Sequence, residues 1–138
     1  MDQTPEYIEL CRKANLPWEP KVGDFVFYSS SPDKFPELNG KIYLVLIVHD
    51  LAKTITIQSF GYSPIEIHKK WSGNIPIWSQ GQLQDMVDNN LKVLCAKFCI
   101  FLKGAGPYNH DFKSMEQLWL AFVMYEKYQK KWNGSDWG

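Results

Sequence analysis

Two cysteines, Cys95 and Cys99, stand four residues apart in a segment that we expect to be helical. This spacing places side chains one turn apart on one face of a helix, where two thiolates could bind a metal ion. The remaining cysteine and the histidines are scattered singly through the chain: Cys11, His49, His68 and His110. A structural zinc site needs four ligands at recognisable spacing. We therefore predict no metal site and no cofactor, and we expect the pair to be buried as small apolar side chains.

Histidine and acid side chains adjoin at His49-Asp50 and His110-Asp111. Sequence neighbours do not face each other in a helix or strand, so adjacency alone is a weak signal. A nucleophilic pair of His110 with either cysteine would need an electropositive, partly exposed setting. The chain has no phosphate-binding glycine loop, zinc-protease motif or nucleophile elbow. A non-enzyme is favoured, and a small enzyme or nucleotide-handling protein using His110, Asp111 and a cysteine is the alternative.

The charge balance bears on the class of partner. Lysine plus arginine and aspartate plus glutamate number 15 each, which gives a formal net charge of zero. General nucleic-acid binders gain most of their affinity from excess positive charge, so the balance counts against that class. Weak self-repulsion makes self-association easier. The aromatic share of 15% requires either a large core or an adhesive surface.

The last predicted helix runs from Ser114 to about Trp132 and is apolar around nearly its whole circumference. One stripe, with Trp119 and Val123, ends in charge at Lys127. We assign this helix to the core, with an interface as the alternative. Basic and aromatic residues mix in the tail, which makes single-stranded nucleic-acid binding a weaker hypothesis. The candidate binding residues are Trp119, Val123, Lys127, Lys130, Lys131 and Trp132.

The remaining pattern predicts an α+β fold with an antiparallel sheet of three to five strands. A capped helix is expected over 4–14, and strands over 25–30, 42–48, 54–60, around 65–68 and over 75–78. The run 42–48 is apolar on both faces, which predicts a central strand that is buried on both sides. Residues 79–103 form one helix or two, broken at Asp88-Asn89-Asn90. We expect these helices to pack on the sheet, and a small barrel is the alternative to an open sheet.

We expect one domain, 1–138, with a helix and lead-in at 1–20, the sheet at 21–78 and a helical part at 79–138. The start, MDQTPEYIEL, lacks the form of a secretory signal, and no apolar run approaches the roughly 20 residues of a membrane span. An odd number of cysteines fits free thiols in a reducing compartment. These features predict a cytoplasmic protein without a membrane partner.

Several segments resemble a family of small uncharacterised phage and prophage proteins of Firmicutes. They are Ile77 to Met86 (IWSQGQLQDM), Ser114 to Met124 (SMEQLWLAFVM), Glu126 to Tyr128, and Trp132 to Gly134. The opening residues 2–8, and Trp18 to Pro20 with Gly23 to Phe25, also fit, whereas 29–75 departs. The resemblance implies a phage or prophage origin and carries no activity or catalytic residue. We therefore expect a non-catalytic accessory protein in the host bacterial cytoplasm that binds a host or phage macromolecule, most of all a protein, with inhibition of a host defence as one role.

Overall fold

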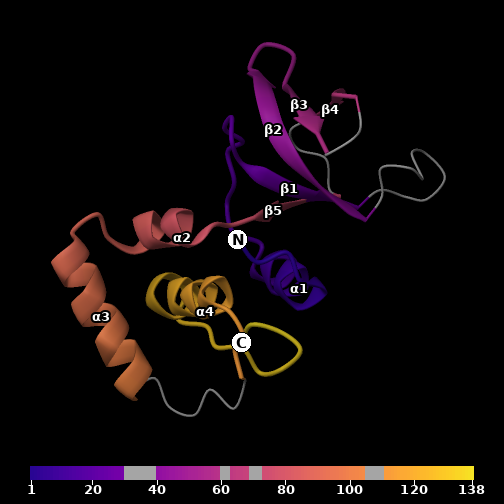
Figure 1. Cartoon of the computed structure of the whole chain (residues 1–138). Coiled ribbons are helices and arrows are strands. Elements are labelled where there is room, and N and C mark those ends of the chain that lie inside the picture. The colour runs from indigo at the N-terminus through magenta and orange to yellow at the C-terminus, as the bar shows by residue number, and fades with distance from the viewer. Residues whose placement is uncertain (30–39, 60–62, 69–72, 105–110) are drawn as a thin grey trace. The chain divides into compact units, whose positions relative to one another are not determined.

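The computed structural model describes residues 1–29, 40–59, 63–68, 73–104 and 111–138, and these form four helices and five strands (Figure 1). All strand pairs are antiparallel, so the predicted α+β class is confirmed. The chain divides into two compact units. The helical unit consists of Met1–Ala14 with Trp78–Gly138, and the sheet unit of Asn15–Ile77.

The sheet unit holds five strands: β1 (Phe25–Tyr28), β2 (Lys41–His49), β3 (Thr54–Gln58), β4 (Ile65–His68) and β5 (Asn74–Ile77). Their order is β4-β3-β2-β1-β5, an open sheet among the described strands, so the barrel alternative is not adopted. Pro76 lies in β5 at one edge. An edge strand tolerates proline because an N–H on its outer side would have no strand to pair with.

The strand predicted over 42–48 is β2, and it is central as expected. Burial on both faces was wrong. Tyr43 and Val45 are almost fully buried, whereas Ile47 is 50% exposed. The pairing with β3 shifts register between Val45 and Ile47, so the alternation of faces changes there.

One face of the sheet carries the core of this unit, formed by Val26, Tyr28, Tyr43, Val45, Ile55 and Ile57. The rings of Tyr28 and Tyr43 meet edge to face at 6.3 Å. The lead-in to β1 is fixed by Asp24, whose Oδ2 accepts hydrogen bonds from the Trp18 indole and the Lys21 backbone N–H, each at 2.9 Å. This carboxylate therefore closes the turn that starts the sheet.

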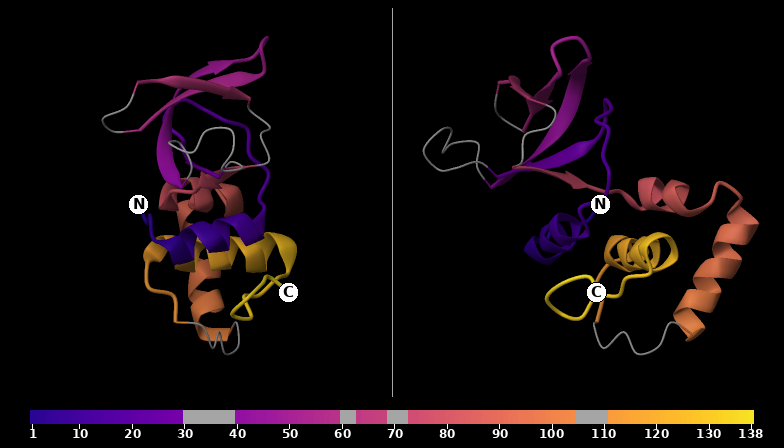
Figure 2. Two further views of the ribbon diagram at one scale, coloured as in Figure 1. Left: turned by 90° about the vertical axis from the view of Figure 1, so that its right-hand side faces the viewer. Right: turned by 180° about the vertical axis from the view of Figure 1, so that it is seen from behind.

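The helical unit is built around α4 (Met115–Tyr128), whose residues Trp119 to Met124 are all buried. The helices α1 (Pro5–Ala14) and α2 (Gln80–Val87) both contact it. In two directions of view, α4 lies between α1 and α3 (Leu91–Gly104) (Figures 1 and 2). The Tyr7 hydroxyl donates to the Trp78 carbonyl at 2.6 Å and thereby joins α1 to the segment before α2.

The segment 79–103 contains two helices. Ser79 begins α2 with a complete capping box, in which the Ser79 side chain accepts from the Gln82 N–H and the Gln82 side chain accepts from the Ser79 N–H. Asp88 is extended and ends α2. Its carboxylate accepts from the Asn90 N–H at 2.9 Å, which turns the chain into the next helix.

The final helix is shorter than predicted. It ends at Tyr128 because Gln129 adopts the left-handed conformation, with φ 55°, and its N–H caps the last turn. The following residues form a small hairpin, with a bridge between Trp132 and Trp137 and a positive φ at Gly134. Trp132 therefore lies outside the helix, and the Asn133-Gly134 signal belongs to this hairpin turn.

Candidate functional site: the outer face of helix α3

Helix α3 starts at a side-chain cap that the sequence supplies. The Asn90 Oδ1 accepts from the backbone N–H groups of Lys92 and Val93, at 3.1 and 3.4 Å. These donors would otherwise lack partners at a helix start. The helix then continues for 14 residues and contains only three charged residues, all of them lysines.

A narrow aromatic contact holds α3 against α4. The Phe98 ring stacks on the Trp119 indole with centroids 4.2 Å apart and planes within 6°. Phe101 meets Phe122 at 5.1 Å and Tyr125 at 5.6 Å. Leu94 and Phe101 are the buried residues of α3, and Phe98 is half-buried. Only one stripe of this apolar helix is therefore covered.

Much of the remaining α3 surface is exposed and carries apolar side chains between its lysines. Ile100 is 70% exposed, Leu91 68% and Leu102 55%, and Val93 is also exposed. Single exposed apolar side chains are ordinary, but a contiguous apolar face marks an interaction surface. We call these four residues, together with Cys95 and Cys99, the outer face of α3. At about 100° per residue, Leu91, Cys95, Cys99 and Leu102 form one stripe of this face, and Val93 and Ile100 form another.

Both cysteines of the predicted pair are exposed, so the expectation that they are buried was wrong. The segment is apolar, as the sequence indicates. Its apolar residues extend around more of the circumference of α3 than the side chains of α4 cover. Cys11 in α1 is the buried cysteine, and burial raises the pKa of its thiol to about 12. Cys11 is therefore held as a neutral thiol, whereas Cys95 and Cys99 are open to other molecules.

The charges of the helical unit are unevenly distributed. Lys92, Lys97 and Lys103 lie on α3 without any acid. Lys97 is 3.8 Å from the Asp88 carboxylate, a surface pair that contributes little to stability. The outer face is thus apolar and flanked by positive charge at both ends of the helix.

Two of the candidate binding residues of α4, Trp119 and Val123, lie in the core. Trp119 is 5% exposed and Val123 is fully buried, so the stripe that contains them is covered. The core assignment made for Trp119 from the sequence matches this burial. The Trp119 indole Nε1 is buried without a hydrogen-bond partner among the described residues.

The tail residues of the prediction are placed differently. Lys127, Lys130 and Lys131 are exposed, and Trp132 is half-buried in the terminal hairpin with its ring 5.2 Å from that of Trp137. The Lys131 ammonium lies 5.7 Å from the centre of the Tyr125 ring. Lys127 lies one turn after Val123 on α4, whereas Lys130, Lys131 and Trp132 follow the end of the helix and do not continue the stripe of Trp119 and Val123.

The enzymatic alternative depended on His110, which lies outside the described residues. Asp111 is exposed. Within the described ranges, no cluster of three or more histidine, cysteine, aspartate or glutamate side chains could hold a metal ion. The described residues of one chain thus form no such metal-binding cluster.

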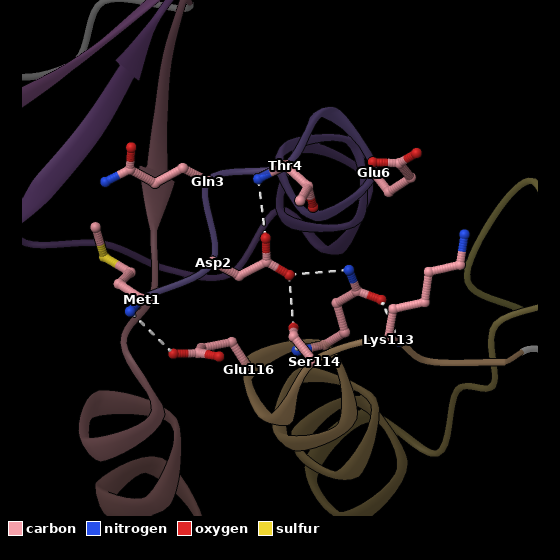
Figure 3. A pocket seen from close by; sticks show the side chains of 9 residues that line it. Met1, Asp2, Gln3, Thr4, Glu6, Lys113, Ser114 and Glu116 are labelled. Carbon is pink, nitrogen blue, oxygen red and sulfur yellow. Dashed lines mark hydrogen bonds and ion pairs between the residues drawn. The ribbon is translucent and has the colours of Figure 1, made fainter.

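An open hollow of about 640 Å³ lies at the start of α1 and α4, lined in part by Asp2, Glu6, Lys113 and Glu116 (Figure 3). The Asp2 carboxylate accepts from the Thr4 N–H at 2.8 Å, the Ser114 hydroxyl at 2.5 Å and the Gln117 amide at 2.9 Å. Burial alone would raise the pKa of Asp2, but these hydrogen bonds hold it below its ordinary value.

These contacts give the hollow a structural role. The Met1 amino group pairs with the Glu116 carboxylate at 3.4 Å, and Ser114 also caps α4 by accepting from the Gln117 N–H. The polar side chains mainly satisfy one another and fasten the first residues to the start of α4. Sequence reasoning missed this cluster because Asp2 and Ser114 are 112 positions apart.

The chain matches no protein-family model, no curated protein and no solved structure. Within the part of the chain that the structure describes, no helix has the length and apolar character required to cross a membrane. The outer face of α3 is therefore the feature on which a function can be argued.

Proposed function

We propose that this chain is a non-catalytic binding protein whose contact surface is the outer face of α3. The observation that supports the proposal is the exposure of Leu91, Ile100 and Leu102 on one helix. Burying each of these side chains against a partner would contribute roughly 1.5–3 kcal/mol before the costs of association. A folded chain gains nothing from leaving them in water, so a function that uses them is favoured.

The shape of this surface suits a protein partner. A helix that presents apolar residues at successive turns binds in the groove of another protein or beside another helix. Lys92 and Lys103 lie near the two ends of α3, where they would meet acidic groups at the rim of such a contact. The proposal therefore keeps a protein as the expected partner.

The resemblance of the α2 and α4 segments to small phage proteins supports an accessory role in an infected bacterium. In this proposal the protein acts in the bacterial cytoplasm and blocks or redirects a host or phage protein, including a component of host defence. Nothing in such a role requires a converging set of catalytic groups.

A second candidate function is single-stranded nucleic-acid binding through Lys127, Lys130 and Lys131, which are exposed beside Trp132. Their positive charge favours phosphate contacts, and such binding weakens steeply with salt. The apolar outer face of α3 offers nothing to a phosphate backbone, so the two functions use different surfaces and can be separated.

The test compares two triple variants with the unmodified chain in affinity capture from bacterial lysate. Leu91→Gln/Ile100→Gln/Leu102→Gln removes the apolar anchors, and Lys127→Gln/Lys130→Gln/Lys131→Gln is the matched control on another exposed surface. Circular dichroism confirms that both variants are folded. We expect a captured protein, a second copy of the chain included, to be lost with the first variant and kept with the second. Equal capture by the α3 variant refutes the proposal, and salt-sensitive capture of single-stranded DNA lost only with the lysine variant supports the second candidate.

A further inference from the structure

The spacing of Cys95 and Cys99 suits two of the four ligands of a tetrahedral metal site. Both are free thiols, both are exposed, and residues four apart on a helix have Cβ atoms about 5–6 Å apart. In a tetrahedral zinc site, with Zn–S near 2.3 Å, neighbouring sulfurs lie about 3.8 Å apart, which two cysteines one turn apart can reach. A closed structural site needs two further ligands.

The helical unit does not supply those two ligands from its described residues. Cys11 is 1% exposed, and burial favours its neutral thiol. No group of three or more suitable side chains is formed within the described ranges. Since the described residues of one chain leave the site at two ligands, we take the two further ligands from another molecule.

The order of residues on the outer face fits a second copy of the same helix. Cys95 and Cys99 are placed symmetrically about Lys97, and Leu91 and Leu102 flank them at nearly equal distances along the helix. If two α3 helices pack antiparallel, Leu91 lies opposite the partner's Leu102, and Cys95 lies opposite the partner's Cys99. Such a contact is isologous, because the same residues serve both chains.

We propose that two α3 helices pair antiparallel through the stripe of Leu91, Cys95, Cys99 and Leu102, and that Cys95 and Cys99 of both chains bind one thiophilic divalent cation, of which zinc is the type. This inference rests on the proposed function and names its partner as a second copy. Packed helices lie about 8–10 Å apart, a separation that leaves room for a cation and four sulfurs between them. Leu91 and Leu102 then enclose the site at both ends.

Charge makes the pairing depend on the cation. Four thiolates around a divalent cation carry a net charge of −2, and each α3 contributes lysines and no acid. Without the cation, the antiparallel arrangement brings Lys92 close to the partner's Lys103 at both ends, where like charges repel. With the cation, the anionic centre offsets that repulsion. The chain is therefore expected to be monomeric without metal and dimeric with it.

The experiment uses the full chain under reducing, oxygen-free conditions, with Zn²⁺ or Co²⁺ added alone and with EDTA as the comparison. Light scattering after gel filtration should give 16.1 kDa in EDTA and twice that mass with metal. The Co²⁺ form should show thiolate-to-metal absorption and tetrahedral d–d bands at one cation per two chains. Cys95→Ser/Cys99→Ser should lose both the absorption and the dimer, with Cys11 unchanged as an internal control.

A second variant separates the helix contact from the thiolates. Leu91→Gln/Leu102→Gln keeps both cysteines and should abolish the dimer while leaving at most weak cobalt absorption. One cation bound per monomer, a dimer of equal mass in EDTA and in metal, or a metal-dependent dimer in the cysteine variant would each overturn the inference. If no metal-dependent dimer forms but the triple variant Leu91→Gln/Ile100→Gln/Leu102→Gln no longer captures a protein that the unmodified chain captures, the inference fails and the proposed function stands. If no metal-dependent dimer forms and the triple variant captures the same proteins as the unmodified chain, both fail.

Discussion

Trp119 is one of the side chains that join α3 to the rest of the helical unit. Its ring stacks on Phe98 at 4.2 Å and meets Phe122 edge to face at 5.5 Å. Replacing it by alanine removes a large buried aromatic and leaves a cavity that its neighbours only partly fill. The expected loss of unfolding free energy is about 3–5 kcal/mol, which corresponds to a fall in melting temperature of roughly 10–20 °C for a chain of this size.

Trp119→Phe provides the matched comparison. The indole Nε1 is buried without a partner among the described residues, and an unsatisfied buried donor costs about 1–3 kcal/mol. Phenylalanine gives up part of the buried area but also removes this donor. We therefore expect Trp119→Phe to cost less than half as much as Trp119→Ala.

Urea and thermal unfolding followed by circular dichroism at 222 nm measure both variants, because a signal from tryptophan fluorescence would change with the substitution itself. Lys127→Ala serves as an exposed control on the same helix and should shift the midpoint little. An unchanged midpoint for Trp119→Ala would refute the core assignment. It would show instead that Trp119 is available to a partner in the free chain.

Three further predictions concern local features. Asp2→Asn should lower stability by about 1–2 kcal/mol at pH 7. Because the folded pKa of Asp2 is lowered, the difference from the unmodified chain should be constant above about pH 5 and vanish as the pH falls through that pKa, and a difference that grows in acid contradicts this. Ser79→Ala should cost about 1 kcal/mol by loss of the α2 capping box, measured by urea unfolding against Ser135→Ala. A disulfide reagent at pH 8 should modify Cys95 and Cys99 quickly and Cys11 only after denaturation, and three fast thiols would refute the burial of Cys11.

The element starts could be predicted from the sequence because their signals are local. Thr4 with Pro5 marks the start of α1, and Ser79 with Gln82 marks the start of α2. Each start uses side chains within one turn of the backbone groups that they cap. The two-helix outcome at 79–103 was left open because Asp88-Asn89-Asn90 can cap or interrupt a helix. The structure resolves it through the Asn90 side chain, which caps α3.

The end of α4 was misjudged for a non-local reason. No glycine or proline stands between Tyr128 and Asn133, so the helical pattern continued to Trp132. The chain leaves the helix at Gln129, and the tail pairs the backbone of Lys131 with that of Gly138. The Trp137 indole also donates to the Leu10 carbonyl in α1 at 3.2 Å. Contacts across the chain therefore outweigh the local helical pattern.

The sequence did not reveal the exposed face of α3. The periodicity of apolar residues shows how apolar a helix is, and it does not show which of its faces other elements cover. The segment 91–104 is apolar on most of its circumference, which is typical of a buried helix. How many of its faces are covered depends on which elements contact it, and the aromatic rings of α4 cover one stripe of it. The exposure of Cys95 and Cys99 follows from that packing and from no feature of their own sequence.

Adjacent residues of α3 provide the sharpest separation of stability from binding. Ile100 is 70% exposed and Phe101 is 3% exposed, although they are neighbours in the same helix. If the outer face is used for binding, Ile100→Gln should change the unfolding free energy by no more than about 0.5 kcal/mol while weakening the binding of a partner protein. Phe101→Ala should lower it by about 3–5 kcal/mol, because its ring packs on Phe122 and Tyr125. Urea unfolding of dilute protein in EDTA measures both in the monomer, and a large loss for Ile100→Gln would mean that this face is covered within the chain itself and is not an interaction surface.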